Sequence, residues 1–248
     1  MNPIATYRVQ LSRQFTLVDA AAIVPYLAKL GISHLYCSPV LAARPGSTHG
    51  YDVVDHGSIN EELGGMPAFL NLVETLRRHG LGLLIDIVPN HMGIAGADNR
   101  LWLDVLEWGR ASPYATWFDI DWDPGDDRRG KVLLPCLGEP YGVVLENGQI
   151  ALRFDPKEGS ISAWYFEHRL PIAPRGYPDI LRAGGAALEA PLREVQSLFA
   201  SRERGLRHAF RSWRRSLAEL AADRAVRGAI HTALGQFSPE SETGRARL

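Results

Sequence analysis

The stretch with the most chemically capable side chains is Leu81–Met92, which reads LGLLIDIVPNHM. Apolar residues fill its first part, and Asp86, Asn90 and His91 stand at its end. A continuous apolar run of this kind predicts a strand that is buried on both faces. Polar groups at the carboxyl end of a buried parallel strand are typical of the active rim of a β/α barrel. For any one of these residues, the alternative is a cap on the turn that follows the strand.

The elements that must position these groups alternate between strand and helix. We expect strands at 4–10, at 32–36 and in the opening of 81–92, and helices at 16–31 and 67–80. Thr16 and Asp19 have the spacing of a capping box, whereas Pro25 lies deep enough to kink the first helix or delay its start. The segment 39–65 reads as a long loop around Thr48–His56. This alternation predicts parallel pairing with right-handed crossovers.

The chain changes character after residue 92. A short helix is expected at 101–108, and short strands are expected at 131–134, 142–145, 150–154 and 163–167. From 187 to 234 the sequence predicts helices, with Gly205 between two of them. The 4-3-4-3 spacing of apolar residues marks a buried seam made of Leu206, Phe210, Trp213, Leu217 and Leu220. The arginines off this seam predict a solvated face, with an anionic-ligand site as the less favoured alternative. The end, 237–248, is polar and is expected to fray.

The composition is that of an ordinary globular protein. The chain has 248 residues, 46% of them hydrophobic, and a formal net charge of -1. This balance gives no electrostatic case for nucleic acid or for an anionic membrane. Cys37 and Cys136 lie far apart in sequence and suggest no disulfide framework, so a reducing cytoplasm is the expected location. The N-terminus lacks the pattern of a signal peptide, and no apolar run approaches the length needed to cross a membrane.

Several motifs resemble the α-amylase superfamily of glycoside hydrolases and transglycosylases. Leu81–Met92 resembles its first signature motif, and Thr48–His56 and Glu62–Gly65 match upstream motifs in the expected order. Further segments are similar to a branch of this superfamily that makes maltooligosyl trehalose, namely Tyr7–Leu11, Tyr36–Pro39, Ser47–Asp55 and Leu137–Gly142. The likeness runs over most of the chain and weakens after about Gly185.

The resemblance implies roles for individual residues. Tyr51 resembles the tyrosine that stacks on the sugar being cleaved, where its π cloud favours the charge of an oxocarbenium ion. His91 resembles the histidine that binds hydroxyls of the same sugar. Asp86 resembles an aspartate that orients an arginine beside the nucleophile, and it would lack that arginine here. The other substrate-binding candidates are Asn90, His49, Asp52 and Asp55.

Each of these roles has a structural alternative. Tyr51 could be a core residue, His91 could be a structural or surface residue, and His49 and Asp55 could equally hold their own loop. Asn90 resembles a calcium ligand of some relatives, but no matching carboxylate cluster accompanies it, so we expect no metal. The tryptophans after residue 92 are expected to be core residues rather than sugar platforms, namely Trp102, Trp108, Trp117 and Trp122.

The fold implied by the resemblance is α/β, the N-terminal part of a (β/α)8 barrel with about three β/α units. We expect residues 1–92 to belong to this barrel, 93–185 to form a β-rich insertion (B-type) domain, and 186–248 to form a helical segment leading back to the barrel. Three parallel strands cannot close a barrel. The chain is therefore expected to be an N-terminal piece of a longer polypeptide or a truncated product, which needs the remainder of its barrel.

The implied activity is an intramolecular transglycosylation of maltooligosaccharides, in which the reducing-end α-1,4 bond becomes an α,α-1,1 bond without a cofactor. In the resembled superfamily the nucleophile lies in a Gly-x-Arg-x-Asp pattern, and this sequence contains no such pattern. We therefore expect the chain to be inactive alone. An α-glucan hydrolase or glucanotransferase of the same superfamily, and a non-catalytic sugar-binding half-barrel, remain open as alternatives.

Overall fold

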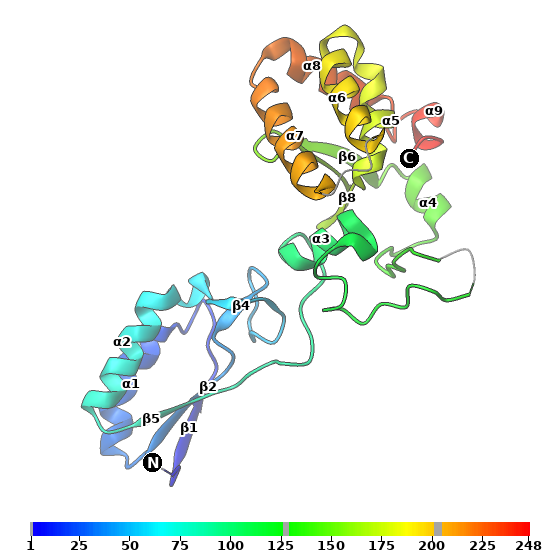
Figure 1. Ribbon diagram of the computed structural model, residues 1–248. Coiled ribbons are helices and arrows are strands. Elements are labelled where there is room, and N and C mark those ends of the chain that lie inside the picture. Colours follow the sequence, from blue (N-terminus) through cyan, green and yellow to red (C-terminus); the bar gives the residue numbers. More distant parts are fainter. Residues whose placement is uncertain (1, 126–128, 201–204) are drawn as a thin grey trace. The chain divides into compact units, whose positions relative to one another are not determined.

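The chain forms two compact units, Met1–Asn99 and Arg100–Leu248 (Figure 1). Their structure is a computed structural model that describes residues 2–125, 129–200 and 205–248. The sequence predicted three parts, with boundaries after residues 92 and 185. In the structure, residues before and after position 185 share one core, because Ile161 and Tyr177 pack in the same cluster as Leu188 and Phe210.

The first unit is built on a sheet of three parallel strands in the order β1-β2-β5. The strands are β1 (Thr6–Val9), β2 (His34–Cys37) and β5 (Gly82–Ile85), and the helices between them are α1 (Leu17–Lys29) and α2 (Gly65–Arg78). The two helices lie side by side along the sheet (Figure 1). The predicted alternation of strands and helices and the parallel pairing are confirmed.

The core of the first unit lies between these helices and one face of the sheet. Val9, Leu35 and Cys37 point into it from the strands, where they meet apolar side chains of α1 and α2. The predicted capping box is present, because Thr16 and Asp19 bond each other at the start of α1. Pro25 lies inside α1 and does not delay its start, since the helix already begins at Leu17.

The expectation that the third strand is buried on both faces is wrong for this chain. Ile85 is 37% exposed and Ile87 is 67% exposed. In the described part of the chain, β5 is an edge strand that pairs only with β2, and the helices cover one face of the sheet. The apolar run therefore forms a strand that is packed against helices on one face and partly exposed on the other.

The expectation of one long loop at 39–65 is also wrong. This segment contains β3 (Leu41–Ala43) and β4 (Val53–Ile59), which pair antiparallel with an irregular register. A short 3-10 helix, η1 (Glu61–Leu63), follows. The strands escaped prediction because β4 carries polar residues without the alternation that marks a half-buried strand. Their hairpin holds the turn that presents Tyr51.

The second unit combines an antiparallel sheet with a set of helices. The sheet has the order β6-β7-β8, with β6 (Ile150–Asp155), β7 (Ser160–Tyr165) and β8 (His168–Pro171). The α-helices are α3 (Arg100–Trp108), α4 (Tyr141–Glu146), α5 (Tyr177–Leu181), α6 (Glu189–Ala200), α7 (Leu206–Leu220), α8 (Arg224–Gly235) and α9 (Glu242–Arg245). The 3-10 helices are η2 (Gly109–Ala111), η3 (Pro174–Gly176) and η4 (Arg182–Leu188). Within the described residues, no helix is both long enough and apolar enough to cross a bilayer.

The predictions for the second unit are partly right. The helix at 101–108 and the strand at 150–154 are confirmed, and the strand expected at 163–167 lies earlier, at 160–165. The strand expected at 131–134 is absent from the described structure, and the one expected at 142–145 is the helix α4. Pro140 is the N-cap residue just before that helix, and only Val144 among the helical residues is buried, which suits a short helix packed on one side.

The predicted seam of α7 is confirmed at its centre. Phe210, Trp213 and Leu217 are buried, while Leu206 is half-buried and Leu220 is 45% exposed. Gly205 stands at the start of α7, as predicted. The C-terminal segment does not fray throughout, because α9 forms there and Leu248 packs against a small cluster around Val144.

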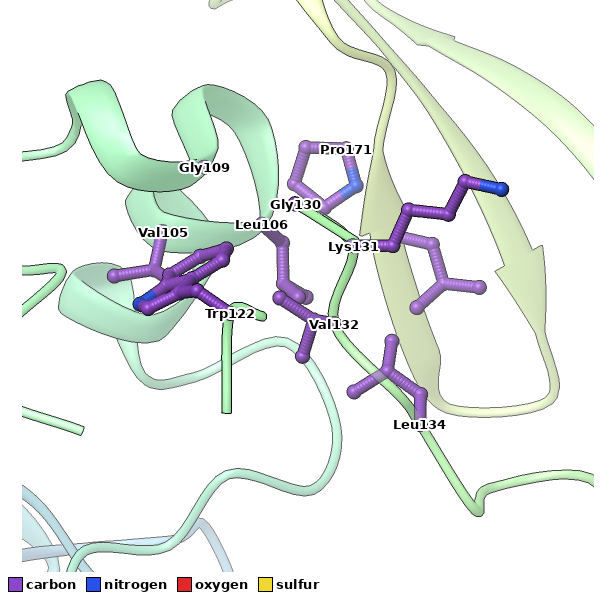
Figure 2. A pocket seen from close by; sticks show the side chains of 10 residues that line it. Val105, Leu106, Gly109, Trp122, Gly130, Lys131, Val132, Leu134 and Pro171 are labelled. Carbon is purple, nitrogen blue, oxygen red and sulfur yellow. The ribbon is translucent and has the colours of Figure 1, made fainter. Parts of the chain in front are cut away.

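The four tryptophans have different environments. Trp102 is buried, and Trp108 packs against the helical core, as expected. Trp117 is 65% exposed, which contradicts the prediction of a core residue. Trp122 is half-buried and lines a cavity of about 250 Å³ in the second unit (Figure 2).

Candidate functional site

The turn that carries Tyr51 is fixed by its own hydrogen bonds. Ser47 donates its hydroxyl to Asp52 at 2.5 Å and accepts the N–H of Gly50 at 3.0 Å. Gly50 has φ +78°, and a Cβ there would lie 3.0 Å from the carbonyl oxygen of Pro39. Only glycine fits that conformation and that close approach without strain. The sequence therefore folds this segment into a rigid turn that projects Tyr51.

Tyr51 meets Asp86 at the carboxyl end of β5. The Tyr51 hydroxyl donates to Oδ2 of Asp86 at 2.5 Å, and the hydroxyl of Tyr36 donates to the same oxygen at 3.2 Å. The N–H of Asp86 bonds the carbonyl of Cys37, so the sheet ladder holds its backbone. Because the hydroxyl of Tyr51 donates to this carboxylate, the pKa of Tyr51 is raised.

Arg8 joins the same group from β1. Its Nη2 donates to the hydroxyl of Tyr51 at 3.2 Å and lies 4.0 Å from Oδ2 of Asp86. Its guanidinium also lies over the ring of Tyr36, 5.5 Å from the ring centre. The hydrogen bond from Arg8 opposes the rise in the pKa of Tyr51.

His91 is placed beside Tyr51 by the chain that leaves β5. Its Nε2 lies 3.0 Å from the carbonyl oxygen of Tyr51, and its Nδ1 lies 3.2 Å from Oδ1 of Asn90. A carbonyl only accepts, so Nε2 carries the proton in the first contact. His91 is exposed and Tyr51 is half-buried, so neither ring is sealed in the core. We call Arg8, Tyr36, Tyr51, Asp86 and His91 the strand-end cluster.

The structure brings three of the other candidates near this cluster. His49 stacks on Tyr51, with ring centres 6.1 Å apart, and accepts the Tyr51 N–H at 3.0 Å. Asn90 is exposed and contacts His91. Asp52 turns toward Ser47 and lies 3.9 Å from His49, which holds the turn rather than lining open space.

Asp55 stands apart from the strand-end cluster. It lies in β4, and its carboxylate accepts the N–H of Gly57 and the hydroxyl of Ser58, both at 2.8 Å. These bonds fit the alternative in which Asp55 holds its own segment. His56, which the sequence analysis did not propose as a site residue, contacts the chain that leaves β5. Its Nε2 lies 3.0 Å from the carbonyl oxygen of Val88, which precedes Asn90 and His91.

Arg8 and Tyr36 were also missed by the sequence analysis as site residues, although both lie in segments that carried the resemblance. The parallel register places Arg8 opposite Tyr36, on the sheet face that does not pack on the helices. The sequence signal that could have indicated Arg8 was its position next to the buried Val9, because neighbouring residues of a strand point to opposite faces of the sheet. Asp86 has other partners in this structure, because Tyr51, Tyr36 and Arg8 all approach it.

The chemistry of this cluster is binding and orientation. Its members include one carboxylate, Asp86, which two phenol groups already engage. Retaining cleavage of a glycosidic bond needs two carboxyl groups about 5 Å apart. Among the described residues, no group of three or more histidine, cysteine or acidic side chains is arranged to hold a metal ion.

The cavity in the second unit is a weaker candidate. The side chains that line it are apolar or aromatic apart from Lys131, and they include Val105, Leu106, Trp122, Leu134 and Pro171. In Figure 2 the Lys131 side chain extends away from the other labelled side chains. Specific sites orient a polar ligand with convergent polar groups, and the described residues that line this cavity provide no such set. We therefore take the strand-end cluster as the candidate site.

Comparison with known proteins shows what the chain resembles. Residues 21–140 match the family described as alpha amylase, catalytic domain. This match agrees with the partial barrel of β/α units in the first unit.

The chain is also similar in sequence to maltooligosyl trehalose synthases. It is 44% identical over 170 residues to a protein of Mycobacterium tuberculosis assigned this name, covering 63% of the chain and 22% of the relative. The solved maltooligosyltrehalose synthase of Arthrobacter ramosus is 46% identical, with a TM-score of 0.60 over 69% of this chain and 21% of that one. Neopullulanase 2 of Thermoactinomyces vulgaris is 38% identical over 98 residues, covering 40% of this chain and 16% of the relative. The chain thus spans about a fifth of the length of these relatives.

Proposed function

We propose that this chain supplies the sugar-binding part of an enzyme that rearranges maltooligosaccharides. The observation that carries the proposal is the contact between His91 and Tyr51 beside Asp86, at the end of a barrel-type strand. In the proposed reaction, the reducing-end α-1,4 bond of the substrate becomes an α,α-1,1 bond. The homology to maltooligosyl trehalose synthases supports this choice.

The proposed roles follow from the geometry of each group. The half-buried ring of Tyr51 stacks on the C–H face of the glucose unit at the cleaved bond. His91 and Asn90, both exposed at the strand end, bind the hydroxyls of that glucose. Asp86 orients the Tyr51 ring through its hydroxyl, and in the complete active site it would also orient a cationic group beside the nucleophile.

The bond rearrangement itself uses groups that this sequence does not contain. A nucleophilic carboxylate displaces the reducing-end glucose and forms a glycosyl ester, while a carboxylic acid protonates the leaving oxygen. The freed glucose then turns in the site, and its anomeric hydroxyl attacks the ester and loses its proton to the same acid/base group. Water must be excluded, because it competes for the ester. We propose that residues 93–185 serve as the insertion (B-type) domain of this superfamily and take part in that exclusion.

The proposal predicts that the 248-residue chain binds maltopentaose without converting it. The test is an NMR titration of purified, folded chain with maltopentaose, followed by prolonged incubation. Saturable binding that Tyr51→Ala abolishes, with unchanged anomeric signals, is the expected result. The matched control is Tyr7→Ala, because Tyr7 is another tyrosine of the first unit that reaches solvent but lies outside the strand-end cluster. A folded wild type that fails to bind, or a Tyr51→Ala variant that binds equally well, would contradict the proposal.

A second candidate is an α-glucan hydrolase or glucanotransferase of the same superfamily. The similarity to neopullulanase 2, at 38% identity over 98 residues, favours it enough to require a test. Any turnover by the chain, or by a longer protein that contains it, separates the two by its products. Non-reducing trehalose ends identify the rearrangement, whereas free maltose identifies hydrolysis. Binding without turnover in every longer form would leave a non-catalytic sugar-binding protein.

A further inference from the structure

We propose that Arg8 is the positioning residue of the strand-end cluster, which fixes both the ring and the turn of Tyr51 for a glucose unit. This inference rests on the proposed role of Tyr51 as the surface on which the sugar stacks. Nothing in the sequence motifs assigns a role to Arg8 beyond the resemblance of its segment.

The first contact fixes the ring. Nη2 of Arg8 donates to the hydroxyl of Tyr51 at 3.2 Å, and that hydroxyl donates its own proton to Asp86. The phenol oxygen is thus held from two sides, by a donor on β1 and an acceptor after β5. A ring held at its far end by two partners has little freedom to tilt, so its face is ready for a pyranose before the sugar arrives.

The second contact fixes the turn. Nη1 of Arg8 donates to Oε1 of Gln10 at 3.2 Å, which orients the amide of Gln10. The Nε2 of Gln10 then donates to the carbonyls of Thr48 and His49, at 3.4 Å and 3.2 Å. These carbonyls belong to the turn immediately before Tyr51. One guanidinium therefore controls the aromatic ring directly and its backbone through Gln10.

The geometry explains why an arginine is suited to this position. Its planar fork presents two nitrogens to separate acceptors while its face lies over Tyr36, 5.5 Å from the ring centre. A lysine ammonium is a point charge without a flat face, so it cannot make both bonds and the stacking contact together. The charge also lies 4.0 Å from Oδ2 of Asp86, the oxygen that accepts from Tyr51.

A purely stabilising role fits Arg8 poorly. Its side chain is 41% exposed, and ion pairs at that exposure contribute little to stability. Val9, the next residue, is buried in the core, so alternation along β1 turns Arg8 to the opposite face. The side chain is therefore placed where it meets the strand-end cluster and solvent rather than the core.

The test compares Arg8→Ala, Arg8→Lys and the control Arg77→Ala in the full chain. Arg77 is an exposed arginine of the same unit, on α2, and contacts only Glu74 among the described ion pairs. We expect Arg8→Ala to weaken maltopentaose binding about tenfold, as for loss of a charged hydrogen bond, and Arg8→Lys to recover part of it. The control binds as the wild type does. Chemical denaturation of each variant shows that the fold is intact.

A second readout follows Tyr51 without sugar. The carbon that bears the hydroxyl of Tyr51 is titrated by NMR, with the signal assigned by Tyr51→Phe. Since the bond from Arg8 lowers the pKa of Tyr51, the pKa should rise further in Arg8→Ala and stay unchanged in Arg77→Ala. An Arg8→Ala variant with wild-type affinity or an unmoved Tyr51 titration would overturn the inference.

The outcomes separate this inference from the proposed function. If the wild-type chain binds maltopentaose through Tyr51 and the Arg8→Ala variant binds it equally well, only the inference about Arg8 is refuted. Wild-type chain that does not bind refutes the proposed function, and the titration of Tyr51 then decides whether Arg8 still fixes the ring.

Discussion

The two units of this protein hold an aspartate in opposite ways. Asp86 in the first unit accepts from the neutral hydroxyls of Tyr51 and Tyr36, and its side chain is 21% exposed. Asp104 in the second unit is 9% exposed and accepts from Arg207 at 3.0 Å and 2.7 Å, and from Arg211 at 3.0 Å. One carboxylate meets neutral donors near solvent, and the other is enclosed by cations.

The difference shows which carboxylate is available for a ligand. Burial pushes the pKa of Asp104 upward, but hydrogen bonds from Arg207 and Ser112 outweigh it and hold that pKa below its usual range. A buried carboxylate saturated by cations has no capacity left for a sugar or for proton transfer. Asp86 keeps a side open to solvent, as its proposed role beside a bound sugar requires.

The partners of Asp104 also show what most of the arginines of α7 do. The sequence allowed a solvated face or an anionic-ligand site for them. Arg215 is exposed, as a solvated face predicts, whereas Arg207 and Arg211 bond Asp104 of α3 and Arg214 bonds Glu107 of α3 at 2.7 Å. We call Asp104, Glu107, Arg207, Arg211 and Arg214 the α3–α7 ion cluster, and its evident role is to join two helices of the second unit.

The largest expected effect is the loss of the buried charge in this cluster. Asp104→Ala should lower the free energy of unfolding by about 3 kcal/mol, because it leaves arginine charges partly buried without their partner. All six tryptophans of the chain lie in the second unit. Urea denaturation followed by tryptophan fluorescence therefore reports on the unit that carries the substitution.

Asp123→Ala is the matched control, since Asp123 also accepts from two arginines, Arg110 and Arg129, but does so at the surface. It should leave the urea midpoint essentially unchanged. Equal effects of the two substitutions would show that burial of Asp104 is unimportant. A matching loss of stability of the first unit in Asp86→Ala, followed in urea by tyrosine fluorescence or circular dichroism, would remove the distinction between the two units.

The comparison also shows what a sequence can reveal. The parallel strands β1, β2 and β5 and the helices α1 and α2 of the first unit were predictable because the Thr16 capping box, the apolar run at 81–88 and the periodicity between them are local signals. Tyr51, Asp86 and His91 were found because each stands beside a distinctive motif. Their mutual contact depended on parallel pairing, which the alternation of elements also predicted.

The remainder depended on contacts between residues far apart in sequence. Asp104 and Arg207 are 103 positions apart, and no periodicity relates α3 to α7. Arg8 becomes a neighbour of Tyr36 only through the register of β1 and β2. Val143 and Val144 favoured a strand by propensity, but packing of a single turn after Pro140 decided for a helix.

The next largest effect should come from Gly159, in the turn between β6 and β7. It has φ +62°, and a Cβ there would lie 1.9 Å from the carbonyl oxygen of Arg214 on α7. Gly159→Ala should therefore destabilise the second unit by about 2–3 kcal/mol, through strain and a backbone clash. Gly205→Ala is the control, because Gly205 has φ +109° but no atom near its absent Cβ. Urea denaturation followed by tryptophan fluorescence should give a lower midpoint for Gly159→Ala than for Gly205→Ala. The reverse order would contradict the close packing of this turn on α7.

A smaller effect concerns pH. Because the folded-state pKa of Asp104 lies below its ordinary value of 3.8, its carboxylate stabilises the fold above that pH, and this contribution is lost as the pH falls through the folded value. Burial raises the pKa of Glu107 above 4.5, so its contribution has the opposite sign and lies at higher pH. Denaturation below pH 4 should therefore show a stability loss of about 1 kcal/mol that is missing in Asp104→Asn. Parallel pH profiles for wild type and variant would show that Asp104 does not titrate differently on folding.

The smallest effect is expected at Tyr36, which tests how firmly Asp86 is held. Tyr36→Phe removes the weaker of the two hydroxyl donors to Oδ2, the one at 3.2 Å, and keeps the ring under Arg8. Tyr51 still occupies that oxygen at 2.5 Å, so affinity for maltopentaose should fall only about two- to threefold. Calorimetric titration measures this change, and Tyr26→Phe, an exposed tyrosine on α1, is the control. If Tyr36→Phe lost as much affinity for maltopentaose as Tyr51→Ala, then Tyr36, and not the turn that carries Tyr51, would set the position of Asp86. The difference between Asp86 and the cation-saturated Asp104 would then require another explanation.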